Sequence, residues 1–267
     1  MSDSNLFTAA FQALMSSDPD EKVRLTHALT AAWREGTLSL EQGVPVEAVP
    51  VPGRPERPAL VQPRDLPKRK PVTVEGRAVL FHALTHIEFN AINLGLDAVY
   101  RFRAMPRDYY DDWLRVADEE ASHFVMLREH LRSLGYDYGD FPGHNGLWEM
   151  AQKTAHDVLV RMALVPRCLE ARGLDVSPGI KAKLLENGDE DGAARLDVIL
   201  RDEIGHVAIG NRWFLYLCEQ RGLEPMVTYN GLIEQYMQGP LRPPFHIEAR
   251  RMAGFSEEEL AYLEGVG

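Results

Sequence analysis

Two short motifs in this chain each pair a carboxylate with an imidazole three residues further on. One motif runs from Glu120 to His123 and the other from Glu203 to His206. On a helix, side chains three residues apart lie on the same face, so each pair could offer one oxygen and one nitrogen ligand to the same ion. Metal binding is the chemistry that this pairing predicts.

A further glutamate precedes each motif on a separate helical stretch. Glu88 lies 32 residues before the first motif, and Glu170 lies 33 residues before the second. A glutamate and a Glu-x-x-His motif, both present twice, form the ligand set of a two-metal carboxylate site in a four-helix bundle. We therefore predict a metal site made by Glu88, Glu120, His123, Glu170, Glu203 and His206.

The ligand types indicate which metals the site would hold. Carboxylate oxygen and imidazole nitrogen together suit iron or manganese, and four carboxylates offset most of the charge of two cations. Zinc is a poorer assignment, because a structural zinc site is a closed set of four ligands and no cysteine takes part here. The prediction is two metal ions, iron in the first place and manganese as the alternative.

Neighbouring polar residues have weaker assignments. Asp202 and Glu119 directly precede the two motif glutamates, and each could accept a hydrogen bond from a ligand histidine or lie on the helix surface. His82 and His86 share a helix with Glu88, but their spacing favours packing over metal contact. Pro166, one turn before a ligand, is expected to open its helix locally, either beside a substrate space or as a packing kink.

The composition describes a chain that can bury a large core. It has 267 residues, 45% of them hydrophobic, without an apolar run near 18 residues or a basic-then-apolar start. Two distant cysteines suit a reducing compartment, so we expect a cytoplasmic protein without a membrane segment. The net charge of −11 opposes nonspecific nucleic-acid binding but leaves room for a local basic patch.

The spacing of apolar residues predicts an all-α fold. A helical hairpin is expected over residues 4–35, and no segment reads as a strand. Gly135 and Gly173 are expected to end the second and third helices of the bundle, and Ser256 to open a last short helix. The four bundle helices are expected at 73–103, 109–134, 147–172 and 193–221.

Four parts follow from this pattern: an N-terminal helical extension (1–43), a proline-rich segment (44–72), a di-metal four-helix bundle (73–221) and a C-terminal extension (222–267). Eight prolines exclude a helix or central strand from the second part. This part is locally basic, and we favour a solvated segment over a binding patch as its interpretation. We expect both it and the C-terminal extension to pack on the bundle.

The sequence blocks around these residues resemble a known superfamily. HALTHIEFNAINLGLDAVYRF, ADEEASHFVMLREHL, VPRCLEARGLD, RDEIGHVAIGNRWF and RPPFHIEARRMAGF, within about residues 70–255, are similar to ferritin-like di-iron proteins. Within that superfamily they most resemble a bacterial ferritin-like family known mainly as a domain of unknown function, whose wider relatives include a tRNA hydroxylase. The resemblance implies a left-handed four-helix bundle and the same six metal ligands. It implies no substrate.

Several functions are compatible with this ligand set. The leading hypothesis is an oxidase or oxygenase that uses dioxygen or peroxide on a small-molecule or nucleoside-like substrate. Because no flavin or iron–sulfur motif is present, an oxygenase would need a separate electron-donor protein. The alternatives are peroxide disproportionation as in manganese catalases, non-catalytic iron binding or storage, and a bundle without metal. The sequence leaves the homo-oligomeric state open.

Overall fold

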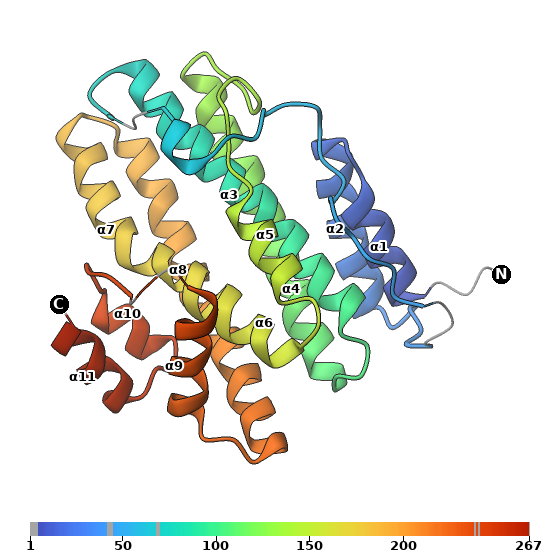
Figure 1. The fold of residues 1–267 in the computed structure, drawn as a ribbon. Coiled ribbons are helices and arrows are strands. Elements are labelled where there is room, and N and C mark those ends of the chain that lie inside the picture. The colour runs from blue at the N-terminus through green and yellow to red at the C-terminus, as the bar shows by residue number, and fades with distance from the viewer. Residues whose placement is uncertain (1–4, 42–44, 68–69, 238, 240, 267) are drawn as a thin grey trace. The chain divides into compact units, whose positions relative to one another are not determined.

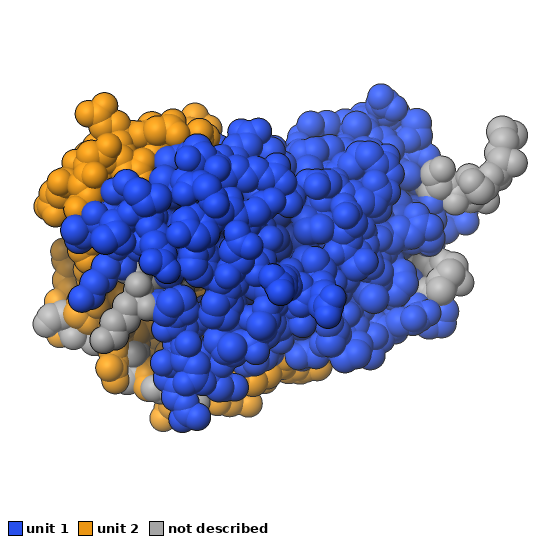
Figure 2. Space-filling view, turned by 90° about the horizontal axis from the view of Figure 1, so that it is seen from above, with its two compact units in different colours: residues 1–152 blue, residues 153–267 orange. Residues whose placement is uncertain are grey.

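The computed structural model describes residues 5–41, 45–67, 70–237, 239 and 241–266. The described chain is all-α: its elements are helices and turns, and its extended pairing is limited to two isolated bridges. It forms two compact units, residues 1–152 and 153–267 (Figure 2). This division falls within the segment 73–221 that the sequence predicts as one bundle, and the four predicted parts stay a prediction. None of the described helices has the length and apolarity needed to cross a membrane.

The first unit is built around two long helices that lie side by side (Figure 1). A short link after residue 101 joins them, so they run antiparallel. The N-terminal hairpin predicted from residue 4, which itself lies outside the described residues, covers them: α1 packs on α3 and α2 packs on α4. The helices of this unit are α1 (Leu6–Met15), α2 (Pro19–Arg34), the 3-10 helix η1 (Pro63–Asp65), α3 (Val74–Arg101), α4 (Arg107–Ser133) and α5 (Gly146–Lys153).

Local sequence explains where α3 and α4 begin and end. Thr73 caps α3, because its side chain accepts a hydrogen bond from the Gly76 backbone N–H at 3.0 Å. Pro106 precedes α4, and Gly135 follows it with a φ of +89°, a conformation that glycine adopts without steric cost. Both predicted helices are therefore confirmed within three residues of their ends.

The proline-rich segment is docked on the first unit, as expected. Its backbone exchanges hydrogen bonds with Gly143, and the Pro50 carbonyl accepts one from the Trp148 indole at 3.2 Å. Gly53 is required where the segment crosses the end of α1, because a Cβ there would lie 2.2 Å from the Met15 carbonyl. Lys68 and Arg69, part of the predicted basic run, lie outside the described residues.

The third helix predicted from the sequence is interrupted in the structure. The third helix, expected as one rod over 147–172, is broken: α5 stops at Lys153, and Asp157 caps a new helix by accepting a hydrogen bond from Leu159 N–H at 2.8 Å. The elements of this unit are α6 (Val158–Leu164), the π-helix η2 (Val165–Glu170), α7 (Ala171–Glu186), α8 (Glu190–Arg221), α9 (Pro225–Tyr236), α10 (Ile247–Met252) and α11 (Glu257–Val266).

The local opening expected at Pro166 is confirmed, since this residue lies in the π-helix η2. Pro166 packs directly on α8: a Cβ added at Gly210 would lie 2.5 Å from its ring. The packing interpretation of Pro166 therefore holds at this contact. The end expected at Gly173 is wrong, because α7 continues through this glycine and Pro178 to Glu186.

The C-terminal extension is docked on the second unit, again as expected, and it is more helical than the sequence suggests. Its α10 packs on α7 and α8, and its α9 packs on α6. Apolar residues of the extension share one buried cluster with α7 and α8: Ala171, Leu174, Val207, Ala249, Ala253, Phe255 and Leu260. Pro240 of this extension lies outside the described residues.

Candidate metal centre

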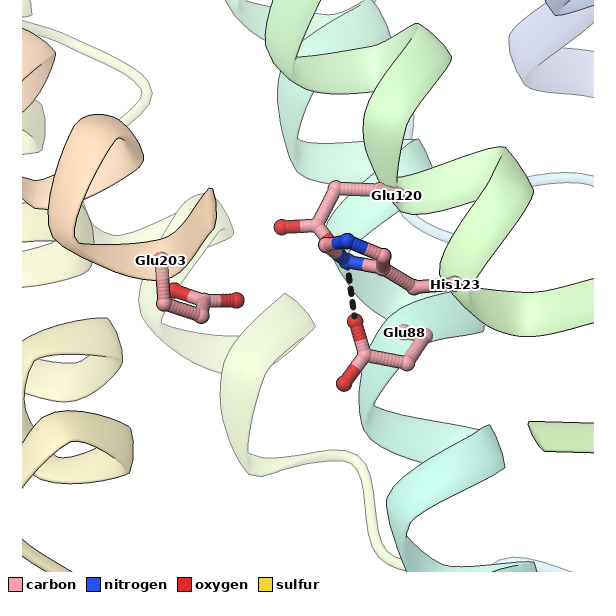
Figure 3. A group of neighbouring side chains, drawn as sticks. All are labelled: Glu88, Glu120, His123 and Glu203. Atoms are coloured by element: carbon pink, nitrogen blue, oxygen red, sulfur yellow. Dashed lines mark hydrogen bonds and ion pairs between the residues drawn. The ribbon is translucent and has the colours of Figure 1, made fainter. Parts of the chain in front are cut away.

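The first predicted ligand set comes together inside the first unit. Helix α3 carries Glu88, and α4 carries Glu120 and His123 on one face (Figure 3). The Nδ1 atom of His123 lies 3.3 Å from Glu120 Oε2 and 3.5 Å from Glu88 Oε2. One ligand atom from each residue lies within 4.8 Å of the others, which is close enough for one ion to contact all three.

These three side chains are buried, which makes their charges costly. Glu88, Glu120 and His123 expose 3%, 1% and 2% of their surfaces. Burial, followed by the repulsion from Glu120, raises the pKa of the Glu88 carboxyl well above its usual range. Burial acts to lower the pKa of His123, but hydrogen bonds with Glu120 and Glu88 outweigh it and raise that pKa to about 11. The two carboxylates therefore favour a positive charge beside them, from a protonated imidazole or from a cation.

The second predicted set lies in the second unit. Helix α8 carries Glu203 and His206, with the Nδ1 atom of His206 3.8 Å from Glu203 Oε1. His206 is fully buried, and the Glu203 side chain is 13% exposed. Glu203 is also drawn in Figure 3. Both Glu-x-x-His motifs thus turn the Nδ1 atom of the histidine toward the glutamate three residues before it.

Glu170 has a distinct backbone setting. It is partly buried, ends the π-helix η2 and directly precedes α7. A π-helix adds one residue to a helical turn and so changes the direction of the side chains that follow. The role of Glu170 as a ligand stays a prediction, as does the full set of six.

The two residues expected to orient the histidines are both partly buried. The carboxylate of Asp202 accepts two hydrogen bonds from the neighbouring Arg201 guanidinium, at 2.8 and 3.1 Å. Glu119 lies on α4 directly before Glu120. Their predicted contact with a ligand histidine stays a prediction.

His82 and His86 pack as expected. His82 Nε2 accepts a hydrogen bond from Gly139 N–H at 3.0 Å, and His86 contacts the Tyr138 hydroxyl at 2.9 Å and the His144 carbonyl at 3.0 Å. Burial lowers the pKa of each histidine to about 4, so both are neutral at pH 7. Across the part of the chain that the structure describes, no His, Cys, Asp or Glu outside the predicted set joins the candidate site.

Comparisons with known proteins identify the family but no activity. The chain is 46% identical over 265 residues to an uncharacterized protein of Haemophilus influenzae (strain ATCC 51907 / DSM 11121 / KW20 / Rd), and the match covers 94% of this chain and 91% of that relative. No solved structure matches the chain. Residues 15–261 match a family model described as "Protein of unknown function (DUF455)", and the chain therefore belongs to that family.

Proposed function

We propose that this protein is a two-metal carboxylate oxidase or oxygenase with a ferritin-like four-helix bundle. In this proposal two ions are bound by the six predicted ligands, Glu88, Glu120, His123, Glu170, Glu203 and His206. The metals are iron, with manganese as the alternative. The substrate is a small or nucleoside-like molecule, and a separate protein supplies electrons.

The single observation that carries the proposal is the contact among Glu88, Glu120 and His123. Two carboxylates and an imidazole are buried here within hydrogen-bonding or ion-pairing distance of one another. Their burial costs free energy of desolvation, and the contacts among them bring no hydrophobic stabilisation in return. Such a group is stable when a cation or a proton offsets the negative charge. The oxygen and nitrogen donors fit iron or manganese, and the site contains no thiolate that would favour zinc.

Each residue of this cluster has a separate role in the proposed site. Glu88 and Glu120 provide oxygen ligands from two helices, which fixes the distance between those helices. His123 would bind through Nδ1, the atom that already faces both carboxylates. When bound, the metal pair would supply redox chemistry with dioxygen or peroxide.

The second motif supports the pairing of two such sets. His206 is as deeply buried as His123, and its Nδ1 atom faces Glu203 in the same way. A glutamate and a histidine at this spacing on one helix can provide two ligands to the same metal site. Metal sites of this class in helix bundles use two such motifs. The two buried thiols, Cys168 and Cys218, form no disulfide, which is compatible with a cytoplasmic protein.

Metal analysis tests the ligand assignment. We expect about two iron or manganese ions per chain in the wild type, and a loss of at least one in Glu120→Ala and in Glu203→Ala. The matched controls are Glu129→Ala on α4 and Glu219→Ala on α8, because both glutamates are exposed on the same helices as the ligands. Equal metal content in ligand variants and controls would reject the site.

Oxygen consumption tests the proposed activity. A chemically reduced, iron-loaded sample should consume oxygen faster than Glu203→Ala, whereas Glu219→Ala should match the wild type. Oxygen release from peroxide by the manganese-loaded protein would instead identify a catalase. Metal binding without either activity would identify an iron-binding protein and end the oxidase proposal.

A further inference from the structure

A buried arginine lies in the π-helix that ends at Glu170. Arg167 belongs to η2 and exposes 1% of its surface. Its Nη1 atom donates a hydrogen bond to Asn211 Oδ1 on α8 at 2.9 Å, and its Nη2 atom donates one to Glu259 on α11. One side chain therefore ties the π-helix to two other helices of the second unit.

Aromatic rings surround the same guanidinium. Its central carbon lies 4.4 Å from the ring centre of Tyr229 and 4.8 Å from the ring centres of Phe214 and Phe255. The Tyr229 hydroxyl also donates a hydrogen bond to the Arg167 carbonyl at 3.4 Å. A cation is attracted to the face of an aromatic ring, most strongly where water is excluded, so these rings hold the Arg167 side chain in one position.

The backbone of a π-helix is a rare form that needs support from its surroundings. In η2 the Pro166 ring packs against Gly210 of α8, and the next residue, Arg167, makes the contacts described above. Glu170 follows three residues later. Loss of the extra residue in the π-turn would rotate Glu170 by about 100° about the helix axis, because an α-helix has about 3.6 residues per turn.

Arg250 in the same unit provides a contrast. It is 2% exposed, pairs with Asp175 at 2.7 Å and also lies over the Phe255 ring. Its carboxylate partner is on α7, the helix that follows Glu170. Arg250 therefore joins the C-terminal extension to α7, whereas Arg167 joins the extension to the π-helix itself.

We propose that Arg167 is a positioning residue for the metal ligand Glu170. Its contacts with Asn211 and Glu259 hold the π-helix in the register that turns the Glu170 carboxylate toward the metal. This inference rests on the proposed function, because Glu170 is a predicted ligand of that site. It adds that the C-terminal extension, through Glu259, controls the affinity for metal.

A double-mutant cycle on metal affinity tests the proposal. Iron(II) is titrated without oxygen into the full chain from which metal has been removed. We expect Arg167→Lys to weaken the binding of one ion by about tenfold, because lysine cannot reach both partners of the guanidinium. Glu170→Asp, which keeps a carboxylate on a shorter side chain, should weaken the same ion, and the double variant should bind it about as tightly as Glu170→Asp alone.

Arg250→Lys is the matched control, because it makes the same change in a buried guanidinium that does not belong to the π-helix. It should lower the melting temperature and leave the affinity for iron(II) unchanged. Far-ultraviolet circular dichroism checks that each variant folds. If Arg167→Lys does not fold, Glu259→Gln replaces it with Glu258→Gln as its control, because Glu259 contacts Arg167 and Glu258 is exposed on the same helix.

The outcomes separate this inference from the proposed function. Wild-type affinity in Arg167→Lys, or equal weakening by this change in the wild-type and Glu170→Asp backgrounds, would overturn the positioning role and leave the metal site intact. Equal weakening by Arg167→Lys and Arg250→Lys would do the same. Unchanged iron(II) binding in Glu170→Ala would reject Glu170 as a ligand, and with it both this inference and the site of six ligands.

Discussion

At the scale of single residues, two buried ionisable side chains, His123 and Lys22, lie close to oxygen atoms that can accept their hydrogen bonds. The His123 imidazole faces two carboxylates, and the Lys22 ammonium donates to the carbonyls of Ala13 and Leu14 at 3.0 and 2.6 Å. These carbonyls belong to the last turn of α1, which has no basic residue of its own. Lys22 therefore satisfies a helix end from a neighbouring helix.

Lys22 should make stability depend on pH. Burial lowers its pKa from 10.5 to about 7, so between these values the unfolded chain binds more protons than the folded chain. Stability then rises with pH through this window, because the cost of a buried charge is present below pH 7 and is relieved above it. Relative to Lys22→Met, the wild type should gain on the order of 3 kcal/mol between about pH 6.5 and about pH 9.5.

Urea denaturation of both proteins at these two pH values would measure the effect. Comparison with Lys22→Met removes the contributions of other titrating groups. Parallel pH dependence of the two proteins would show that Lys22 titrates normally.

At the scale of elements, helix α7 depends on the C-terminal extension. Asp175 accepts hydrogen bonds from the Arg250 guanidinium and from the His246 backbone N–H at 2.9 Å, and its carboxylate is fully buried. Arg172, one turn earlier, donates to the carbonyls of Arg242 and Pro244. The extension thus supplies partners for polar groups on α7, which also contains an internal proline.

Asp175→Ala should destabilise the second unit strongly. Removal of one partner from a buried ion pair leaves the other charge buried and costs about 3–5 kcal/mol. The control is Glu248→Ala, which breaks an exposed pair with Arg251 and should cost about 0–1 kcal/mol. Thermal and urea unfolding would measure both variants, and similar losses would contradict the assigned role of the buried pair.

At the scale of the whole molecule, the chain consists of two compact units, and each contains one predicted ligand set (Figure 2). The first unit has Glu88 and the motif from Glu120, and the second has Glu170 and the motif from Glu203. The repeat of the motif in the sequence therefore coincides with the division of the structure. An ancient internal duplication of a helix pair would explain this match.

Removal of metal should lower the melting temperature of the whole chain. A ligand present at about one hundred times its Kd stabilises the folded state by about 2.7 kcal/mol, or about 5–10 °C for a chain of this size. Dialysis against a chelator followed by differential scanning calorimetry would measure the shift. Glu120→Ala combined with Glu203→Ala should melt at the same temperature with and without the chelator, and a similar shift in this double variant would count against the proposed site.

The extent of agreement between sequence and structure differs among the elements. The helices around Glu88 and Glu120 could be predicted because capping residues and proline-free apolar periodicity mark them locally. The third helix could not, since its break depends on Thr154 and Asp157, which bind Arg161 and Arg221. Asp157 before an apolar run was a signal for a helix start, but an aspartate within a helical pattern is too common to be decisive.

By itself, the sequence determined the all-α class and the helices that carry Glu88, Glu120, His123, Glu203 and His206. It also determined that the two members of each Glu-x-x-His pair lie on the same face of their helix. Helical geometry acts over three or four residues, so local spacing is sufficient for these features. Only the tertiary structure decided that α7 continues past Gly173, that the Arg250 guanidinium pairs with Asp175, and that Pro166 packs on Gly210. Each of these depends on residues more than forty positions apart or on packing at close range, and local sequence does not encode such contacts.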